Sequence, residues 1–427
     1  MSLVTNIEKL GIENSELRKN ALEILEVGLE AINTEKILRE RISMHDGAFC
    51  LEGMGFQCQF YERIFFIGIG KCAFDGARVI EDILGDALTD GIVVDVKAGS
   101  LRKIKSYTGT HPNPSPNNIA ITKQILEMVK GVTSRDLVLV LVSGGGSALL
   151  SLPYEISCEA LVHVSTELTE RGADIYEMNT VRKHLSLVHG GGLAKHLYPA
   201  QVVSLIFSDV LGNDISVVAS GPTVRDETTK EDAQDVLDKY KVGADLKLVE
   251  TPKDPELFSK VRNFLIVSNA DALVAMKQKA EELGYNASIE SEILSGEASE
   301  VGEELAKQEM KDHTCLLYGG ETTVKIAHNN GKGGRNQELA LSALPHLPEG
   351  RVLVAATSDG WDNTDAAGAI ADRAMYEHAI MLNLEPKKFL ENNDSYNFWK
   401  DSGGAIYTGR LESNVSDLII ILNRNGK

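Results

Sequence analysis

Clusters of glycine with charged or hydroxyl residues directly follow short apolar runs at several points of this 427-residue sequence. They occupy residues 68–71, 143–147, 319–322 and 357–360. Backbone N–H groups can approach a phosphate closely only where no Cβ intrudes, and a helix that starts at such a turn adds positive potential. The repeated pattern therefore predicts an enzyme that binds phosphorylated anions.

The first cluster, Gly68-Ile69-Gly70-Lys71, is compatible with two kinds of site. It begins the pattern G-x-G-x-x-A, and Asp95 ends the next expected strand, where an acid of a dinucleotide-binding fold would contact a ribose. A lysine inside the turn favours instead a transferring phosphoryl group or a substrate carboxylate. A tight strand-to-helix turn with an exposed lysine is the structural alternative.

The second cluster has three consecutive glycines between two serines, in the order Ser143, Gly144, Gly145, Gly146 and Ser147. Glycine is costly in chain entropy, and a nest of N–H donors flanked by hydroxyls would justify that cost at a phosphate or carboxylate site. Close packing of a helix on a strand is the structural alternative. Because the phosphate-cradle pattern G-x-x-x-x-G-K-[ST] does not occur in the sequence, this would be a nucleotide site of another type.

Several charged residues near the other turns are candidates for the chemistry. Arg182 offers a bidentate fork for a phosphate or a carboxylate. Asp209 follows an apolar run, where it could act as a base, bind a metal or cap a turn. Arg335 stands at an expected helix start, where the positive end of the helix dipole disfavours a cation. An anionic ligand that binds both the arginine and the helix start would make this position more favourable. Asp359 and Asp362 offer hard oxygen ligands for Mg²⁺ on nucleotide phosphates, with an Asp-rich turn as the equal alternative.

The elements that must position these residues alternate between strand and helix. Strands are expected at 64–67, 92–96, 137–142 and 202–207, with helical patterns between them. The alternation predicts an α/β fold with a doubly wound, mostly parallel sheet. Such sheets bind their ligands at the carboxyl ends of the strands, where the glycine clusters lie.

The length of the chain favours two domains. A charge-rich stretch that ends in a proline-containing connection separates them, which predicts an N-terminal α/β domain at 1–245 and a second, smaller α/β domain at 258–427. A first helix with Ser15 as its N-cap and a short helix after Thr34 are expected in the N-terminal domain. The apolar strand expected at 418–422 could instead return to the first domain.

Charge and composition narrow the class of protein. A formal net charge of −19 argues against binding to nucleic acid or to an anionic membrane surface, and it requires local cations or a metal for an anionic substrate. No apolar stretch reaches the length of a membrane helix, and no secretory signal is evident. The five cysteines show no metal-ligand spacing and are expected as reduced thiols. These features predict a cytoplasmic protein.

Taken together, these short stretches resemble the class II glycerate kinase family, which pairs an N-terminal glycerate kinase domain with a C-terminal MOFRL domain. They occur in the order of the family across nearly the whole chain, which makes the resemblance specific although each stretch is short. The matching stretches are Gly-Ile-Gly-Lys at 68–71, Ser-Gly-Gly-Gly-Ser-Ala-Leu at 143–149, Asn-Thr-Val-Arg-Lys-His-Leu-Ser at 179–186, Ser-Asp-Val at 208–210, Ala-Ser-Gly-Pro-Thr at 219–223, Gly-Gly-Glu-Thr-Thr-Val at 319–324, Gly-Gly-Arg-Asn-Gln-Glu at 333–338 and Asp-Ala-Ala-Gly-Ala at 365–369.

The resemblance implies ATP-dependent phosphorylation of D-glycerate, usually on the 2-hydroxyl to give 2-phosphoglycerate and ADP, with Mg²⁺ or another divalent cation. It also implies an active site in the cleft between two α/β domains. We expect glycerate and ATP as partners, with no nucleic acid or membrane and with a homodimer as one assembly to test. The functional residues of the family carry over to Lys71, Glu321, Arg335, Asp359 and Asn414.

Phosphoryl transfer needs positioning and neutralisation of oxygen charge more than covalent help, and this assigns a role to each charged candidate. We expect Lys71 and Arg335 to stabilise the transferring group. Asp359 and Asp362 are expected to bind the metal, and Arg182 to hold an anionic group of either substrate.

The remaining candidates complete this hypothesis. The turn at 143–147 is expected to seat a phosphate or the glycerate carboxylate, and Asp209 to accept the proton of the reacting hydroxyl. One rival function is an NAD(P)H-dependent hydroxypyruvate reductase, which the G-x-G-x-x-A pattern and Asp95 favour. A non-enzymatic phosphosugar-binding module is a second rival, which the acidic cluster and the cationic Lys71 and Arg335 disfavour.

The chain departs from the family pattern at several positions. His189 stands where the family usually has a lysine, and Ser115 where it usually has an acidic residue. In the C-terminal loop, Arg410 and Glu412 place long charged side chains where small ones are typical. We expect these differences to alter local contacts with phosphate or substrate.

Overall fold

The computed structural model describes residues 2–11, 15–243, 246–326 and 331–424, so residue 245, where the first predicted domain ends, lies outside the described residues. The chain divides into two compact units. Thr34–Ile266 form the first, called the parallel-sheet unit below, and Met1–Asn33 with Val267–Lys427 form the second, called the mixed-sheet unit.

The first helix belongs to the mixed-sheet unit, which differs from the predicted domain at 1–245. Ser15 caps helix α1 (Glu16–Ala31) as predicted, by accepting a hydrogen bond from the backbone N–H of Arg18. The apolar face of α1 packs on α10 (Asn269–Glu282), and the buried Arg18 forms an ion pair with Asp372 at 2.6 Å. Burial of an amphipathic helix against a distant partner, rather than its place in the sequence, therefore decides its domain.

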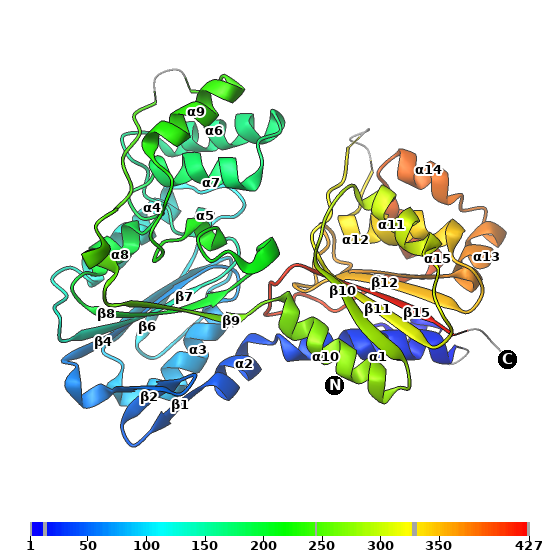
Figure 1. Ribbon diagram of the computed structural model, residues 1–427, viewed down its shortest axis with the longest axis horizontal. Helices are drawn as coiled ribbons and strands as arrows, with labels where there is room; N and C mark the ends of the chain where they lie inside the picture. The colour runs from blue at the N-terminus through cyan, green and yellow to red at the C-terminus, as the bar shows by residue number, and fades with distance from the viewer. Residues whose placement is uncertain (1, 12–14, 244–245, 327–330, 425–427) are drawn as a thin grey trace. The chain divides into compact units, whose positions relative to one another are not determined.

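A six-stranded sheet forms the centre of the parallel-sheet unit (Figure 1). Its strands are β4 (Arg63–Ile69), β5 (Asp90–Asp95), β6 (Ile104–Thr108), β7 (Asp136–Val142), β8 (Gln201–Phe207) and β9 (Val261–Val267). They lie in the order β6-β5-β4-β7-β8-β9, and the pairs from β6 to β8 are parallel. Because the order runs outward in both directions from the pair β4 and β7, the predicted doubly wound sheet is confirmed.

Strand β9 is the edge strand of this sheet, although the predicted boundary assigned it to the domain at 258–427. A backbone hydrogen bond from Val202 N–H to the Lys260 carbonyl (2.9 Å) ties the start of β9 to β8. At the centre, all seven residues of β7 are buried, as expected for a near-continuous apolar strand covered on both faces.

Helices cover both faces of the parallel sheet, with α3 and α2 on one face and α4 and α8 on the other (Figure 1). Ser115 and Pro116 open α4 as predicted, because proline at the first helical position has no N–H to lose. The bounds are α2 (Thr34–Arg41), α3 (Ala73–Leu84), α4 (Pro116–Met128) and α8 (Gly192–Leu197).

Three further helices form a separate layer with a small core of its own (Figure 1). We call this layer the helical cap; it consists of α6 (Cys158–Glu170), α7 (Ile175–His184) and α9 (Lys230–Tyr240). Leu161, Val181 and Leu237 are among its buried side chains. The cap forms one wall of the pocket described in the next section.

A small antiparallel sheet that sequence analysis did not predict precedes the parallel sheet. It is formed by β1 (Ile42–His45), β2 (Ala48–Leu51) and β3 (Met54–Gln57). Asp46 and Gly47 join the first two strands, and both have positive φ angles, as a two-residue hairpin turn requires.

The mixed-sheet unit also has a six-stranded sheet, which confirms the second, smaller α/β domain. Its strands are β10 (Asn286–Leu294), β11 (Thr314–Gly320), β12 (Arg351–Thr357), β13 (Gly368–Asp372), β14 (Ala405–Ile406) and β15 (Asp417–Asn423), in the order β10-β11-β15-β12-β13-β14. The last strand, β15, lies between β11 and β12 and is antiparallel to both. It therefore does not return to the first sheet.

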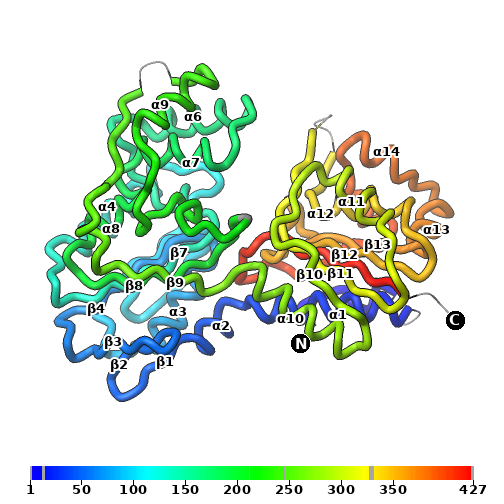
Figure 2. Tube along the Cα trace, in the orientation of Figure 1, coloured from blue at the N-terminus to red at the C-terminus, as the bar shows by residue number. Residues whose placement is uncertain are grey.

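Helices cover both faces of the mixed sheet as well. The blue α1 runs along the red β15 in Figure 2, with α10 beside it, so segments from both ends of the chain pack on one face. The other face carries α11 (Ala298–Lys307), α12 (Arg335–Ala343), α13 (Arg373–Met381), α14 (Pro386–Glu391) and α15 (Ser395–Ser402). Trp399 is fully buried in this core and donates a hydrogen bond from its indole N–H to the Gln337 carbonyl at 2.8 Å.

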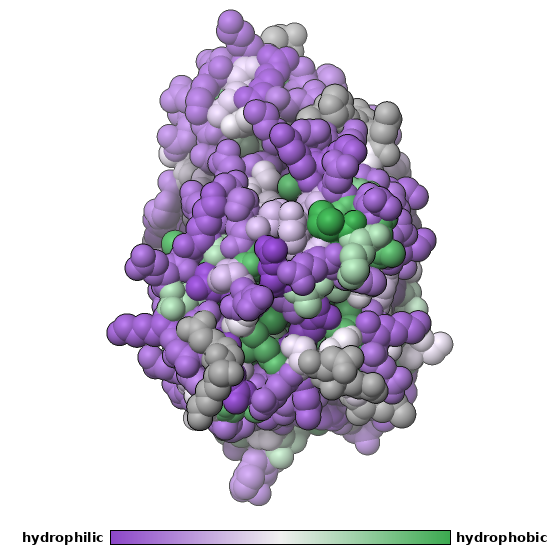
Figure 3. All heavy atoms as spheres, turned by 90° about the vertical axis from the view of Figure 1, so that its right-hand side faces the viewer, coloured by the Kyte–Doolittle hydropathy of each residue, from purple (hydrophilic) through white to green (hydrophobic). Residues whose placement is uncertain are grey.

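In the part of the chain that the structure describes, no helix is long and apolar enough to cross a membrane. The face of the molecule in Figure 3 is mainly hydrophilic, with apolar side chains in small separate groups.

Candidate active site

The glycine turns after β4 and β7 lie against each other at the carboxyl edge of the parallel sheet. Lys71 N–H donates to the Gly144 carbonyl at 3.0 Å, and Ser143 N–H donates to the Ile69 carbonyl at 2.9 Å. Gly70 has a φ of 121°, and a Cβ there would lie 2.1 Å from the Ser143 hydroxyl oxygen. This glycine is therefore required by the close approach of the two turns, in agreement with the structural alternative for that residue.

The side chain of Lys71 lies beside the second turn. Gly145, whose φ is 80°, precedes the short helix α5 (Gly146–Leu149). A Cβ at Gly145 would lie 3.2 Å from Lys71 Cγ and 3.0 Å from His111 Cδ2. The turn therefore brings Lys71 and His111 together, whereas the fully buried Ser143 contacts the β4 turn instead of facing a ligand.

Asp95 has a structural role that does not fit ribose binding. It is fully buried, and its carboxylate accepts hydrogen bonds from the N–H groups of Phe74 (2.9 Å) and Val96 (2.5 Å). Burial raises the pKa of Asp95 to about 6, and the backbone donors oppose that rise. The acid thus holds the start of α3, which removes the residue on which a dinucleotide site depended.

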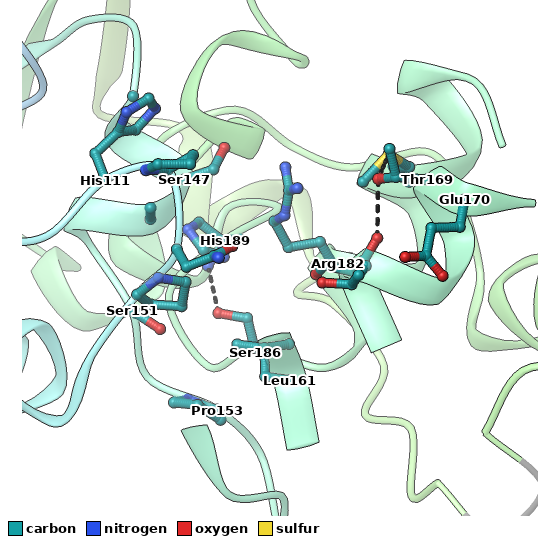
Figure 4. Close-up of a pocket in the computed structure, with 18 residues that line it drawn as sticks. His111, Ser147, Ser151, Pro153, Leu161, Thr169, Glu170, Arg182, Ser186 and His189 are labelled. Carbon is teal, nitrogen blue, oxygen red and sulfur yellow. Dashed lines mark hydrogen bonds between the residues drawn. The ribbon is translucent and has the colours of Figure 1, made fainter. Parts of the chain in front are cut away.

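A pocket of about 420 Å³ opens beside these turns within the parallel-sheet unit (Figure 4). The turn at 145–148, the helical cap and the segment 186–189 contribute to its lining. Arg182 extends from α7 toward Ser147 in Figure 4, with His189 nearby. Among the described residues, the hydrogen bonds of its guanidinium are long, to Asn179 Oδ1 (3.4 Å) and Ser220 Oγ (3.5 Å), and burial lowers its pKa.

Three further candidate residues of this unit have contacts or positions that differ from those of Arg182. Ser147 Oγ and Ser220 Oγ are 2.8 Å apart, so the second serine of the glycine turn meets the 219–223 segment. Lys183 is buried and pairs with Asp226 at 3.1 Å, which gives it a structural role. Asp209 is half-buried just after β8, and it is not among the described residues that line the pocket.

A second group of candidates gathers at one edge of the mixed sheet. The ends of β11 and β12 both pair with the start of β15, because Asp417 lies opposite Gly320 on one side and Thr357 on the other. This register brings Glu321 and Asp359, which follow those strand ends, to the same edge. The sheet topology thus explains how residues distant in sequence meet here.

Arg335, the first residue of α12, is held at this edge by two carboxylates. Its Nε and Nη2 donate to the two oxygens of Asp417, at 2.6 and 3.0 Å, and Nη1 donates to Glu321. Although burial opposes the charge, Asp417 and then Glu321 raise the pKa of Arg335. Sequence analysis did not identify Asp417; its only signal is an acid at the start of the last apolar strand.

The carboxylate of Asp362 is engaged with the start of α12. It accepts hydrogen bonds from the backbone N–H groups of Asn336 (3.2 Å) and Gln337 (2.9 Å), and from the Gln337 side chain (2.9 Å). A Cβ at Gly334 would lie 2.1 Å from the Asp362 carbonyl oxygen, so glycine is needed there. Burial, followed by the charge of Asp417, raises the pKa of Asp362 to about 6.

Asp359 and Asn414 belong to two loops that bind each other. Asp359 Oδ1 accepts hydrogen bonds from Thr357 Oγ1 (3.2 Å) and the Trp361 N–H (3.0 Å). Ser358 anchors the C-terminal loop through its carbonyl and hydroxyl oxygens, which places the half-buried Asn414 near Asp359. Arg410, one of the departures from the family pattern, stacks on Trp361 at 4.2 Å.

The fit of these carboxylates to a divalent cation differs between them. Within the described residues, no group of three or more His, Cys, Asp or Glu side chains could hold a metal ion. Mg²⁺ in nucleotide sites commonly uses one or two carboxylates together with substrate phosphates, so a smaller set suffices. To bind a cation, Asp362 would have to give up its bonds to α12. The Asp359 carboxylate accepts from Thr357 and Trp361, which lie within two residues of it in the sequence.

Comparison with known protein families divides the chain into an N-terminal and a C-terminal region. Residues 20–250 match the family described as "Domain of unknown function (DUF4147)", and residues 314–417 match the MOFRL family. The two matches lie in the order expected from the resemblance.

Known proteins are similar to this chain over nearly its whole length. The chain is 37% identical over 422 residues to the D-glycerate 2-kinase of Thermotoga maritima, covering 95% of this chain and 98% of that protein. It is 36% identical over 436 residues to the glycerate 2-kinase of Pyrococcus horikoshii, covering 95% and 97%. The crystal structure of the glycerate kinase from Thermotoga maritima superposes with a TM-score of 0.84 at 38% identity, covering 96% of this chain and 99% of that chain. Together with the motifs and the fold, these similarities show that the chain belongs to the class II glycerate kinase family.

Proposed function

We propose that this protein catalyses the ATP-dependent phosphorylation of D-glycerate on its 2-hydroxyl, giving 2-phosphoglycerate and ADP. The observation that carries the proposal is the 37% identity, over 95% of the chain, to a protein named D-glycerate 2-kinase. The strand-end position of Lys71 and the sheet-edge position of Arg335 are compatible with that chemistry, because phosphoryl transfer depends on placing cations around phosphate oxygens.

Arg335 is proposed to stabilise the transferring phosphoryl group. The side chain of Asp417 is 2% exposed, and it fixes the plane of the guanidinium through its two hydrogen bonds. The side chain of Glu321, which accepts from the third guanidinium nitrogen, is 45% exposed. A phosphate that approaches from the exposed side would compete with Glu321 and leave the pair with Asp417 intact. Glu321 therefore acts in this proposal as a replaceable partner that keeps Arg335 oriented before the nucleotide binds.

Lys71 is proposed to stabilise the negative charge of a phosphoryl group from the turn that follows β4. The adjoining turn at 143–147 is proposed to contribute the backbone N–H donors of Gly144 and Gly145 to a substrate anion, whereas the N–H of Gly146 donates to the Ser143 carbonyl at 3.2 Å. Asp209 is proposed to accept the proton of the reacting hydroxyl.

A divalent cation, with Mg²⁺ as the first choice, is proposed to neutralise charge on the nucleotide phosphates when bound. Asp359 is proposed as its carboxylate ligand, with Asn414 available nearby as a polar contact for a substrate. Asp362 is proposed to support this region by holding the start of α12 and thereby Arg335.

The cellular setting in this proposal is the cytoplasm. All five cysteines lie among the described residues and are free thiols, in keeping with a reducing compartment. A homodimer is the first assembly to test by light scattering.

The reaction is tested by two assays on the same preparation. ADP formation from ATP, Mg²⁺ and D-glycerate is followed with a coupled enzyme system, and NADH loss is followed with hydroxypyruvate. Glycerate-dependent ADP formation that chelation with EDTA abolishes would support the kinase. NADH oxidation without ADP formation would overturn it in favour of a reductase, and binding of glycerate without either turnover would favour a non-enzymatic module.

A further inference from the structure

Arg182 carries a positive charge into the pocket without an acidic partner. Among the described residues, no carboxylate lies within ion-pair distance of its guanidinium, and its two protein hydrogen bonds are 3.4 and 3.5 Å long. Burial already lowers its pKa, so the charged form is disfavoured unless an anion joins it. The guanidinium of Arg182 therefore lacks a counter-ion within ion-pair distance among the described residues, although Glu170 also lines the pocket.

His189 lines the same pocket; its backbone N–H donates to Ser186 Oγ at 3.4 Å, whereas its two ring nitrogens have no hydrogen-bond partner among the described residues. Its side chain is buried, with the residue only 3% exposed, and no described atom makes a hydrogen bond of good geometry with either ring nitrogen. Burial, reinforced by the charge of Arg182 and opposed by the nearby Leu150 carbonyl, lowers the pKa of His189 to about 3. The imidazole is thus neutral at physiological pH, with one donor and one acceptor to offer.

The charges of the pocket select the kind of ligand. Its lining contains one permanent cation, Arg182, and one acidic residue, Glu170. A nucleoside triphosphate brings several negative charges, which this lining would leave mostly unmatched. A single carboxylate matches Arg182, and a hydroxyl group matches a neutral imidazole, because a hydroxyl both donates and accepts.

The position of the pocket connects it to the reaction. Gly145 lines the pocket, and the Lys71 side chain lies against the same glycine. A cavity of about 420 Å³ exceeds many times the roughly 30 Å³ that one water molecule occupies, so a small hydroxy acid and several waters can share it.

We propose that this pocket is the acceptor site, in which the carboxylate of D-glycerate pairs with Arg182 and a hydroxyl of the same molecule exchanges hydrogen bonds with His189. The inference rests on the proposed function and deepens it: it assigns one substrate to one place and makes His189 a positioning residue for that substrate. The nucleotide is then bound by other residues.

The test is calorimetric titration of the full-length enzyme with D-glycerate in the absence of nucleotide. Arg182→Gln removes the cation and is expected to weaken glycerate binding about a hundredfold, and His189→Leu about tenfold. His189→Gln, which keeps a donor and an acceptor, is expected to retain most of the affinity. The same variants are titrated with a non-hydrolysable ATP analogue, whose affinity is expected to stay within about twofold.

Matched substitutions outside the pocket serve as controls. Arg225→Gln removes an exposed arginine of the same unit, and His163→Gln removes an exposed histidine of the helical cap. Both are expected to bind glycerate as the wild type does. If Arg182→Gln fails to fold by circular dichroism, Met178→Trp takes its place, because a larger side chain on α7 fills the pocket.

The outcomes separate this inference from the proposed function. Unchanged glycerate affinity in both Arg182→Gln and His189→Leu, beside normal phosphorylation of glycerate by the wild type, would overturn the acceptor site and leave the reaction standing. A loss confined to the ATP analogue would likewise overturn it, by assigning the pocket to the nucleotide. Failure of the wild type both to bind and to phosphorylate glycerate would overturn the reaction, and the acceptor site with it.

Discussion

Arg335 and Asp417 are joined by two hydrogen bonds, from Nε at 2.6 Å and from Nη2 at 3.0 Å, although 82 residues separate them in the sequence. The pair exists because β15 begins between the ends of β11 and β12, at the edge where α12 starts. A bidentate contact fixes the plane of a guanidinium, so Asp417 decides where the third nitrogen of Arg335 points.

Substitutions in this pair are expected to lower turnover more than substrate binding. Arg335→Ala should reduce kcat by about 10² to 10³, the usual cost of removing a donor that stabilises charge in a transition state. Arg335→Lys should recover little, because an ammonium cannot make the bidentate contact. Asp417→Asn should reduce kcat by a smaller factor at similar KM; steady-state kinetics measure each. Unchanged kcat in Arg335→Ala would remove this arginine from the mechanism.

Lys71 offers a second kinetic prediction, in the parallel-sheet unit. Lys71→Ala is expected to lower kcat by orders of magnitude while the fold is kept, because the backbone N–H of residue 71, not its side chain, bonds to Gly144. Thermal unfolding should therefore match the wild type within a few degrees, and Lys130→Ala, an exposed lysine of the same unit, provides the control. Wild-type turnover in Lys71→Ala would contradict the role assigned to its ammonium group.

Asp95 leads to a prediction about stability and pH. Its pKa of about 6 in the folded protein lies above the ordinary value of 3.8, so the folded state binds more protons than the unfolded state between these values. The contribution of Asp95 to the free energy of unfolding is therefore fully present at low pH. It decreases by at most about 3 kcal/mol as pH rises from about 4 to 6.

The Asp95→Asn variant tests this contribution through the pH dependence of the free energy of unfolding. The variant loses hydrogen bonds to the start of α3 and is expected to be less stable throughout, but the difference from wild type should shrink as pH rises from 4 to 6. Urea unfolding at a series of pH values measures it, and Asp86→Asn, at an exposed site, should leave the dependence unchanged. A difference that is constant with pH would refute the raised pKa.

The place of α1 in the mixed-sheet unit is tested by shortening the chain. A protein that begins at Thr34 lacks the buried face of α1, including Leu22 and Leu25, and leaves Asp372 without Arg18. Loss of one partner of a buried ion pair alone costs about 3–5 kcal/mol, so the mixed sheet should unfold at lower urea than in the full chain. Trp399, which is buried in its core, reports this by fluorescence, whereas Trp361 of the same unit is exposed. Identical unfolding of the two proteins would place α1 outside the unit's stable core.

Local signals in the sequence predicted much of this fold. Ser15 at the start of α1 and Pro116 at the start of α4 cap their helices as expected, because capping depends on a few neighbouring residues. The hairpin at Asp46-Gly47 was missed although its turn signal is present, since strands of four residues show little alternation.

What could not be predicted depends on contacts between distant segments. Asp362 was predicted to bind a metal from its type and spacing, but its bonds to Asn336 and Gln337 form only once α12 reaches it. Asp417 gave no signal of its own, because its partner is known only from strand order. His189 was noticed as a departure from the family pattern, whereas its burial in a pocket beside Arg182 needed the three-dimensional structure.

The most direct test of the central claim is the NMR spectrum of the product formed from ¹³C-labelled D-glycerate, ATP and Mg²⁺. The account predicts that phosphorus coupling appears on carbon 1 as well as on carbons 2 and 3, the pattern of 2-phosphoglycerate, and that Lys71→Ala and Arg335→Ala both strongly reduce the rate at which this product forms. Phosphorus coupling on carbons 2 and 3 without coupling on carbon 1, the pattern of 3-phosphoglycerate, or no phosphorylated product at all from the folded wild-type enzyme, would contradict it.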